Sequence, residues 1–230
     1  IPSGADVYGV TGCSVHLKQM TELLSQLSGL KIAGGPHATA KPEELLEMGF
    51  DTVVAGEGDE VISHIVERGM TGIITAPRIK NLDYIFPCRN HESRYHYTID
   101  GLKATTMITS RGCPWECAFC SKEVYNRLRV ARNVESVMAE IDAVMDLGYQ
   151  AIMFYDDTFM TGRERLVALC EVLQERHLVW RCLARSDDVD KEILALMVES
   201  GCREIGVGVE SGSQTILDNI HKHETVEQHK

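Results

Sequence analysis

The feature of this sequence that most limits its possible folds is a repeated alternation of short β-branched segments with amphipathic helical segments. Residues 6–11, 30–35 and 51–57 are predicted strands, and each precedes a stretch in which apolar residues recur at helical spacing. Strands that alternate with helices pair in parallel, because each helix returns the chain to the same end of the sheet. An α/β fold is therefore predicted, beginning with a Rossmann-like, doubly wound sheet.

A second alternating series follows a stretch, residues 71–102, in which the periodicity fades and Pro77 and Pro87 interrupt the chain. We expect a domain boundary near residue 90, which divides the chain into domains 1–90 and 91–230. The strands predicted in the second domain are residues 103–110, 151–155, 179–185 and 204–210. Four successive βα units favour either a partial (β/α) barrel or an open sheet.

Three helix starts are predicted within the second series. Asn133 is expected to cap one helix, Thr161 and Glu164 have the spacing of a capping box, and Ser213 precedes the last helix. Ile1 stands almost directly before a strand and Lys230 lies in a polar stretch, so we expect the sequence to be a fragment of a longer chain.

The charge of the chain narrows its possible partners. A formal net charge of −11 and a pI near 5.3 argue against nucleic acid or an anionic membrane surface as partner, and a small-molecule substrate fits better. The sequence contains no apolar run of the roughly 20 residues that a membrane span needs, and its first residues do not resemble a signal peptide. A cytoplasmic location is expected.

The sequence RGCPWECAFC places Cys113, Cys117 and Cys120 on what is predicted to be one loop after a strand. Three thiolates are too few for a closed zinc site, so such a loop leaves one coordination position open. They could hold a 4Fe-4S cluster by three of its irons, or zinc together with one further residue. The other five cysteines are scattered singly and are interpreted as small core residues.

This loop resembles the signature of the radical SAM superfamily, CxxxCxΦC with Φ aromatic, which Cys113, Cys117, Phe119 and Cys120 match. The resemblance implies an oxygen-sensitive enzyme whose 4Fe-4S cluster binds S-adenosylmethionine and cleaves it reductively. It also implies an electron donor such as flavodoxin or ferredoxin.

The same resemblance suggests further cofactor-binding residues at the carboxyl ends of the predicted strands. Asp156 and Asp157 are candidates for the methionine amino group, although an acidic pair of this kind also caps helices. Glu210 and Ser211 match the position at which the family contacts the ribose or methionine portion. Arg185 is a candidate for the cofactor carboxylate, with a salt bridge to an aspartate of the following SDD run as the alternative.

The first domain resembles the cobalamin-binding domain that precedes the barrel in a large subclass of these enzymes. Gly34 and Gly35 match its GG element beside the nucleotide tail of cobalamin, and Thr11 and Ser14 match the polar turn before it. The family often carries a DxHxxG element whose histidine can ligate cobalt, and this element does not occur in the sequence. We expect either that it lies upstream of Ile1 or that cobalamin is bound without that ligand. His37 is interpreted as a turn residue rather than as that ligand.

The hypothesis is a cobalamin-dependent radical SAM enzyme that starts radical methylation of a small molecule. Two alternatives stay open: an oxidative cyclase that acts on a tetrapyrrole, and a non-catalytic zinc-binding module. The segment HKHETVEQHK near the end is interpreted as a solvated face or the start of a linker.

Overall fold

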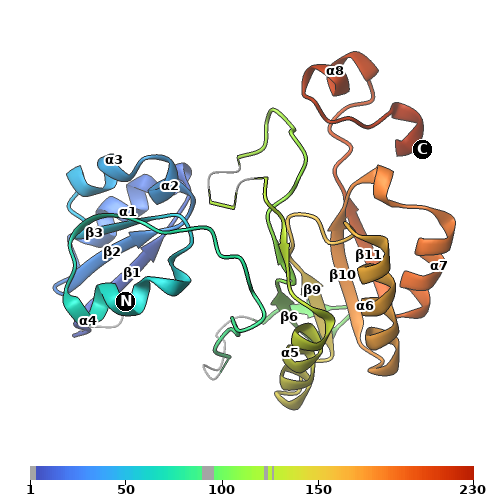
Figure 1. The fold of residues 1–230 in the computed structure, drawn as a ribbon, viewed down its shortest axis with the longest axis horizontal. Coiled ribbons are helices and arrows are strands. Elements are labelled where there is room, and N and C mark those ends of the chain that lie inside the picture. The colour runs from blue at the N-terminus through green and yellow to red at the C-terminus, as the bar shows by residue number, and fades with distance from the viewer. Residues whose placement is uncertain (1–3, 90–95, 122–123, 126) are drawn as a thin grey trace. The chain divides into compact units, whose positions relative to one another are not determined.

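The computed structural model describes residues 4–89, 96–121, 124–125 and 127–230 (Figure 1). The chain divides into two compact units, one of Ile1–Lys80 with Ser121–Asn126 and one of Asn81–Cys120 with Arg127–Lys230. The domain boundary expected near residue 90 falls beside residues 90–95, which lie outside the described residues, and it stays a prediction.

The first unit contains a parallel four-stranded sheet in the order β1-β2-β3-β4. Its strands are β1 (Val7–Thr11), β2 (Leu30–Gly34), β3 (Thr52–Ala55) and β4 (Gly72–Thr75). Its α-helices are α1 (Leu17–Leu24), α2 (Pro36–Ala40), α3 (Pro42–Glu47) and α4 (Ile62–Arg68), with 3₁₀ turns at Ser14–His16 and Gly58–Glu60. The predicted parallel α/β arrangement is confirmed.

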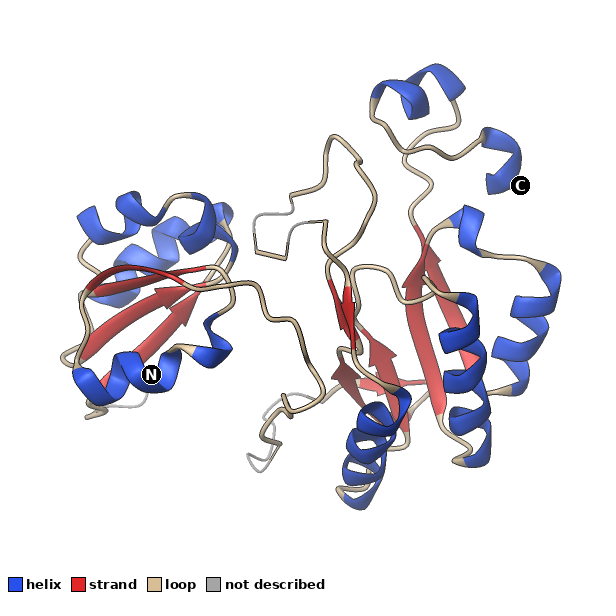
Figure 2. Cartoon of the chain, viewed as in Figure 1, coloured by secondary structure: helices blue, strands red, loops and turns tan. Residues whose placement is uncertain are grey.

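The helices of this unit cover both faces of its sheet (Figure 2). Met20 of α1 and Leu45 of α3 pack with Val53 on one face, whereas Ile65 of α4 packs with Ile32 and Val54 on the other. Strand β4 was missed in the sequence, because its four residues, GIIT, are too few to show periodicity beside the polar stretch that follows.

The second unit is built on a sheet in the order β11-β10-β9-β6-β5, in which β5 is antiparallel to β6 and the other neighbours are parallel. Its strands are β5 (Thr98–Ile99), β6 (Leu102–Met107), β9 (Ala151–Phe154), β10 (Val179–Ala184) and β11 (Cys202–Val207). The two short strands β7 (Ser110–Arg111) and β8 (Val130–Ala131) form a separate antiparallel pair. The four parallel strands match the four predicted βα units.

Three helices pack on one face of this sheet (Figure 1). The helices of the unit are α5 (Val134–Asp146), α6 (Arg163–Glu175), α7 (Lys191–Glu199) and α8 (Gln214–Asn219), with 3₁₀ turns at Ser186–Asp188 and Val226–His229. The core between sheet and helices centres on Phe154, Phe159 and Trp180, and the two phenylalanine rings stack with centroids 4.6 Å apart.

The predicted helix caps have mixed outcomes. The side chain of Asn133 accepts a hydrogen bond of 2.7 Å from the backbone N–H of Ser136, which confirms it as the cap of α5. The predicted capping box of Thr161 and Glu164 is wrong: α6 starts after Gly162, and the hydroxyl of Thr161 bonds to that of Thr158 instead.

Within the described residues, none of the helices is long and apolar enough to cross a membrane.

Candidate active site

The three cysteines of the signature lie in the segment between β7 and β8, which follows the carboxyl end of β6. The antiparallel pairing of β7 with β8 closes the base of this loop, which we call the cysteine loop (residues 112–129). None of these three cysteines forms a disulfide bond; the side chains of Cys113 and Cys117 are partly buried and that of Cys120 is exposed. The backbone N–H of Ala118 donates a 2.8 Å hydrogen bond to the carbonyl of Ile220, which holds the loop from a second side.

Two adjacent aspartates at the end of β9 hold the start of the cysteine loop. The buried carboxylate of Asp156 accepts hydrogen bonds of 2.6 Å from the backbone N–H and hydroxyl of Thr109 and from the hydroxyl of Ser110. The carboxylate of Asp157 accepts a 2.7 Å bond from the backbone N–H of Gly112, directly before Cys113. The contact of these aspartates with a methionine amino group stays a prediction. In the structure, both aspartates hold the start of the cysteine loop through hydrogen bonds.

The electrostatics around Asp156 follow from its burial. Burial raises the pKa of this carboxyl, and the hydrogen bonds from Ser110 and Thr109 oppose the rise. Arg165 is partly buried nearby and donates to the carbonyls of Arg132 and Thr109, both at 3.1 Å. Burial lowers the pKa of Arg165 to about 10, so its guanidinium stays charged at neutral pH.

Arg185, at the end of β10, lies against the cysteine loop. Its guanidinium carbon is 4.0 Å from the centre of the Trp115 ring, and its Nη1 is 3.9 Å from the Sγ of Cys117. Nε and Nη2 each donate a 2.8 Å hydrogen bond to the carboxylate of Asp187, which is the alternative partner that the sequence suggested. Binding of a cofactor carboxylate by Arg185 stays a prediction.

The segment after α8 contacts this site, and its interpretation as a solvated face or linker is wrong for two of its residues, whereas most of the others are exposed. Lys222 and Glu224 are only 5% and 1% exposed. The ammonium group of Lys222 lies 3.6 Å from the carboxylate of Glu210 and 3.7 Å from that of Glu224. The sequence offered one signal for this ion pair: Lys222 and Glu224 have opposite charges and stand two positions apart. In an extended segment, side chains two positions apart point to the same side.

Glu210 and Ser211 follow β11 at the predicted edge of the sheet. Glu210 has a left-handed backbone, with φ of 58°, and Ser211 accepts a hydrogen bond of 3.1 Å from the backbone N–H of Ser213. Their contacts with a ribose or methionine group stay predictions.

The donor chemistry of the cysteine loop fits an iron–sulfur cluster. Three cysteines on one loop that form no disulfide bond, with a guanidinium beside one of them, are suitable ligands for a cluster that keeps one iron open. In the described part of the chain, no three Cys, His, Asp or Glu side chains are gathered closely enough to enclose a single metal ion.

The first unit has a cavity at the carboxyl ends of its first three strands. It measures about 370 Å³, and its lining includes Thr11, Gly34, Gly35, Gly56 and Asp59. The predicted glycine pair and one of the two predicted polar residues are thus brought together at one opening. In doubly wound sheets this edge is where ligands bind.

Close packing explains why Gly35 is a glycine. Its φ is 91°, and a Cβ atom at this position would lie 2.3 Å from the Oγ1 of Thr11. The second predicted polar residue, Ser14, is hydrogen bonded to Nδ1 of His37 at 2.9 Å. His37 is buried within α2, so its interpretation as a turn residue is wrong.

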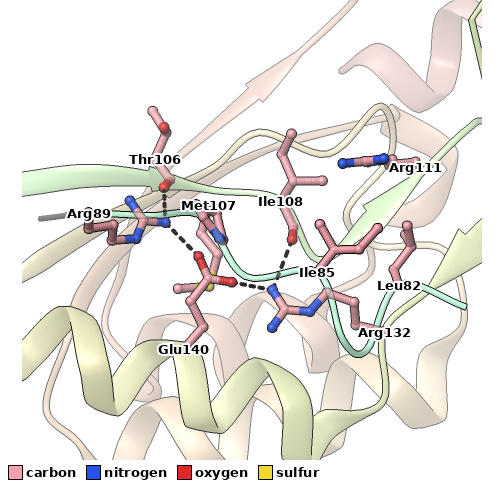
Figure 3. Close-up of a pocket in the computed structure, with 10 residues that line it drawn as sticks. Leu82, Ile85, Arg89, Thr106, Met107, Ile108, Arg111, Arg132 and Glu140 are labelled. Atoms are coloured by element: carbon pink, nitrogen blue, oxygen red, sulfur yellow. Dashed lines mark hydrogen bonds and ion pairs between the residues drawn. The ribbon is translucent and has the colours of Figure 1, made fainter. Parts of the chain in front are cut away.

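A smaller pocket on the second unit contains a buried group of charges (Figure 3). Glu140 of α5 forms ion pairs with Arg132 and with Arg89, the latter at 2.5 Å. Arg89 also donates to the hydroxyl of Thr105 and the carbonyl of Thr106, both at 2.9 Å. These contacts hold the first segment of the second unit against β6 and α5.

The cysteines outside the signature divide into two groups. Cys170, Cys182 and Cys202 are buried in the second unit, as interpreted, whereas Cys13 and Cys88 are exposed and do not belong to a core.

Comparisons with known proteins agree with this fold. The family model of the radical SAM superfamily matches residues 107–230. An uncharacterized methyltransferase of Pyrococcus horikoshii is 29% identical over 223 residues, which cover 86% of this chain and 49% of the relative. The anaerobic magnesium-protoporphyrin IX monomethyl ester cyclase of Cereibacter sphaeroides is 28% identical over 88% of this chain and 39% of its own length.

Among solved structures, the radical S-adenosylmethionine methyltransferase TsrM from Kitasatospora setae superposes with a TM-score of 0.77 at 16% identity, covering 98% of this chain and 53% of TsrM. At that identity the likeness shows the fold alone. The chain spans about half the length, or less, of these proteins. The family match covers more than half of the chain and includes the entire cysteine loop, so this chain belongs to the radical SAM superfamily.

Proposed function

We propose that this chain is part of a cobalamin-dependent radical SAM enzyme that starts the methylation of a small-molecule substrate. The observation that carries the proposal is the cysteine loop itself, which places three cysteines at the carboxyl end of a parallel strand. The loop is held from two neighbouring strands, by Asp157 at the end of β9 and by Arg185 at the end of β10.

In this proposal Cys113, Cys117 and Cys120 hold a 4Fe-4S cluster and leave its fourth iron open. When bound, such a cluster supplies the electron that cleaves S-adenosylmethionine to a deoxyadenosyl radical. An electron donor such as flavodoxin or ferredoxin is required. The protein's own residues fix the loop, because Asp156 and Asp157 restrain its start.

Cobalamin is proposed for the cavity of the first unit. The glycines at its opening let a large ligand approach the backbone, and Thr11 offers a hydroxyl group there. TsrM, which shares the fold, is known in a form with cobalamin and a [4Fe-4S] cluster bound. Methyl transfer is supported by relatives named as methyltransferases, including the hopanoid C-2 methylase of Rhodopseudomonas palustris, which is 26% identical.

Oxidative cyclisation of a tetrapyrrole is the second candidate reaction. It is favoured by the relatives named as magnesium-protoporphyrin IX monomethyl ester cyclases, which are 28% and 27% identical to this chain. Product analysis with labelled S-adenosylmethionine separates the two, since methylation moves the labelled methyl group to the product and cyclisation does not.

The test is anaerobic reconstitution of the chain with iron and sulfide, followed by EPR of the reduced protein with and without S-adenosylmethionine. A cluster signal that shifts when the cofactor is added is the expected result, because the cofactor binds the open iron. Addition of hydroxocobalamin should also give a bound, protein-shifted cobalamin absorbance.

Serine variants of single cysteines provide the control. Cys113→Ser, Cys117→Ser and Cys120→Ser should each lose the open-iron signal, whereas Cys13→Ser and Cys88→Ser, at exposed positions outside the loop, should keep it. Uptake of about one zinc without any cluster, or a cluster that does not respond to the cofactor, contradicts the proposal.

A further inference from the structure

The guanidinium group of Arg185 lies beside the sulfur of a signature cysteine, with its Nη1 3.9 Å from the Sγ of Cys117. Arg185 is only 6% exposed, and its guanidinium also lies over the ring of Trp115. Both contacts reach into the cysteine loop from β10, across 68 positions of sequence in the case of Cys117. A cation that stacks on an indole ring in a buried site is held in a defined place.

The other side of the guanidinium is fixed by groups that do not belong to the loop. Asp187 accepts two hydrogen bonds of 2.8 Å, and the carbonyl of Lys222 accepts a third of the same length. The carboxylate of Glu224 lies 3.3 Å from Nη2. Because Nη1 of Arg185 lies beside Cys117 and Nη2 donates to the carbonyl of Lys222, Arg185 connects the cysteine loop with the segment after α8.

We propose that Arg185 is a positioning residue that holds the cysteine loop and raises the reduction potential of the cluster through its charge beside Cys117. This inference rests on the proposed function, because it requires that Cys117 is a cluster ligand. Hydrogen bonds and charges at cluster sulfurs are among the factors that set the potential of iron–sulfur centres.

The direction of the effect follows from electrostatics. Reduction adds one electron to the cluster, so the cluster and its thiolates become more negative by one charge. A buried cation beside one of those sulfurs stabilises the reduced form more than the oxidised form. The carboxylate of Asp187 partly neutralises that cation, and removal of its charge should therefore have the opposite effect.

The experiment is a redox titration of the reconstituted chain followed by EPR, with dithionite as reductant. Arg185→Gln should lower the midpoint potential, so that at a fixed solution potential the ratio of reduced to oxidised cluster falls about tenfold, which equals 59 mV for a one-electron couple. Arg185→Lys keeps the positive charge, and its midpoint potential should lie between that of Arg185→Gln and that of the original protein. Asp187→Asn should raise the potential.

Arg181→Gln is the matched control. Arg181 lies on the same strand, but its guanidinium pairs with Glu204 at 3.2 Å and stacks near Tyr97 instead of meeting the cysteine loop. Its removal should leave the midpoint potential unchanged.

The midpoint potentials of Arg185→Gln and Asp187→Asn should shift in opposite directions. General damage to the loop would not produce opposite shifts, so this result distinguishes a charge effect from such damage. If Arg185→Gln does not hold a cluster, Asp187→Asn alone still tests the direction of the charge effect, because its midpoint potential should rise. Equal potentials in all variants of a protein whose cluster responds to S-adenosylmethionine overturn this inference and leave the proposed function intact. Absence of a cluster from the original protein overturns both.

Discussion

The carboxylate of Asp156, just after β9, accepts a 2.6 Å hydrogen bond from the hydroxyl group of Ser110, which lies 46 positions earlier at the base of the cysteine loop. Two further bonds of 2.6 Å, from the backbone N–H and hydroxyl of Thr109, complete the arrangement. A buried acid on one strand therefore sets where the loop from the neighbouring strand begins.

Replacement of this acid should destabilise the second unit. In Asp156→Asn an amide N–H₂ group faces three donors, and at least one buried donor loses its acceptor. We expect a loss of about 2 kcal/mol or more in the free energy of unfolding, measured with urea. Asp146→Asn, at an exposed position of α5, should change the same quantity by no more than about 0.5 kcal/mol. Equal effects at the two positions would show that the hydrogen bonds to Asp156 contribute nothing.

The cavity of the first unit offers a second test, at its glycine pair. Gly35→Ala places a methyl group 2.3 Å from the hydroxyl oxygen of Thr11, in addition to the strain of a positive φ. Gly49→Ala carries the same kind of strain, with φ of 105°, but a Cβ atom there meets no atom within 4 Å. We expect Gly35→Ala to cost about 1 kcal/mol more than Gly49→Ala in urea unfolding.

The same pair of variants tests the proposed cofactor. Gly35→Ala should weaken the binding of hydroxocobalamin, measured by absorbance, whereas Gly49→Ala should bind it as the original protein does. Undiminished binding of hydroxocobalamin by Gly35→Ala would place the cobalamin site away from this cavity.

The buried charges in Figure 3 provide a third prediction. Glu140→Gln removes the acid that Arg89 and Arg132 share and leaves two guanidinium groups without their carboxylate. Loss of one partner from a buried ion pair costs about 3 to 5 kcal/mol, and we expect a loss in this range in urea unfolding. Glu135→Gln, on the exposed side of the same helix, is the control and should be nearly neutral. A neutral Glu140→Gln variant would mean that the ion pairs do not stabilise the fold.

Asp51 should make the stability of the first unit depend on pH. The backbone N–H of Lys31 donates a 2.8 Å hydrogen bond to its carboxylate and lowers the pKa of Asp51 below the usual value of 3.8. The pKa is lower in the folded state than in the unfolded state. The stabilisation is thus fully present above pH 3.8 and is lost as the pH falls through the folded-state pKa.

The measurement is urea unfolding of the original protein and of Asp51→Asn over this acidic range. The difference in stability between the two should be largest well above pH 3.8 and should shrink below it. Asp6→Asn, at an exposed position before β1, should give a difference that does not follow this course. A constant difference for Asp51→Asn would contradict a lowered pKa.

Local patterns in the sequence were sufficient for the order of strands and helices, for the Asn133 cap and for the cysteine loop at a strand end. Each of these depends on residues that lie within a few positions of one another, where periodicity and capping chemistry act directly. The four-residue strand β4 was missed for the same reason, since so short a segment carries little periodic signal.

Only the tertiary structure decided which distant residues surround that loop. Arg185 reaches Cys117 across 68 positions, Asp156 reaches Ser110 across 46, and Lys222 and Glu224 are buried although their segment has the composition of a solvated linker. The sequence thus determined the elements and the chemistry of the thiols. The charges and hydrogen bonds around them were decided by the register and packing of parallel strands, because those bring together side chains that no local pattern relates.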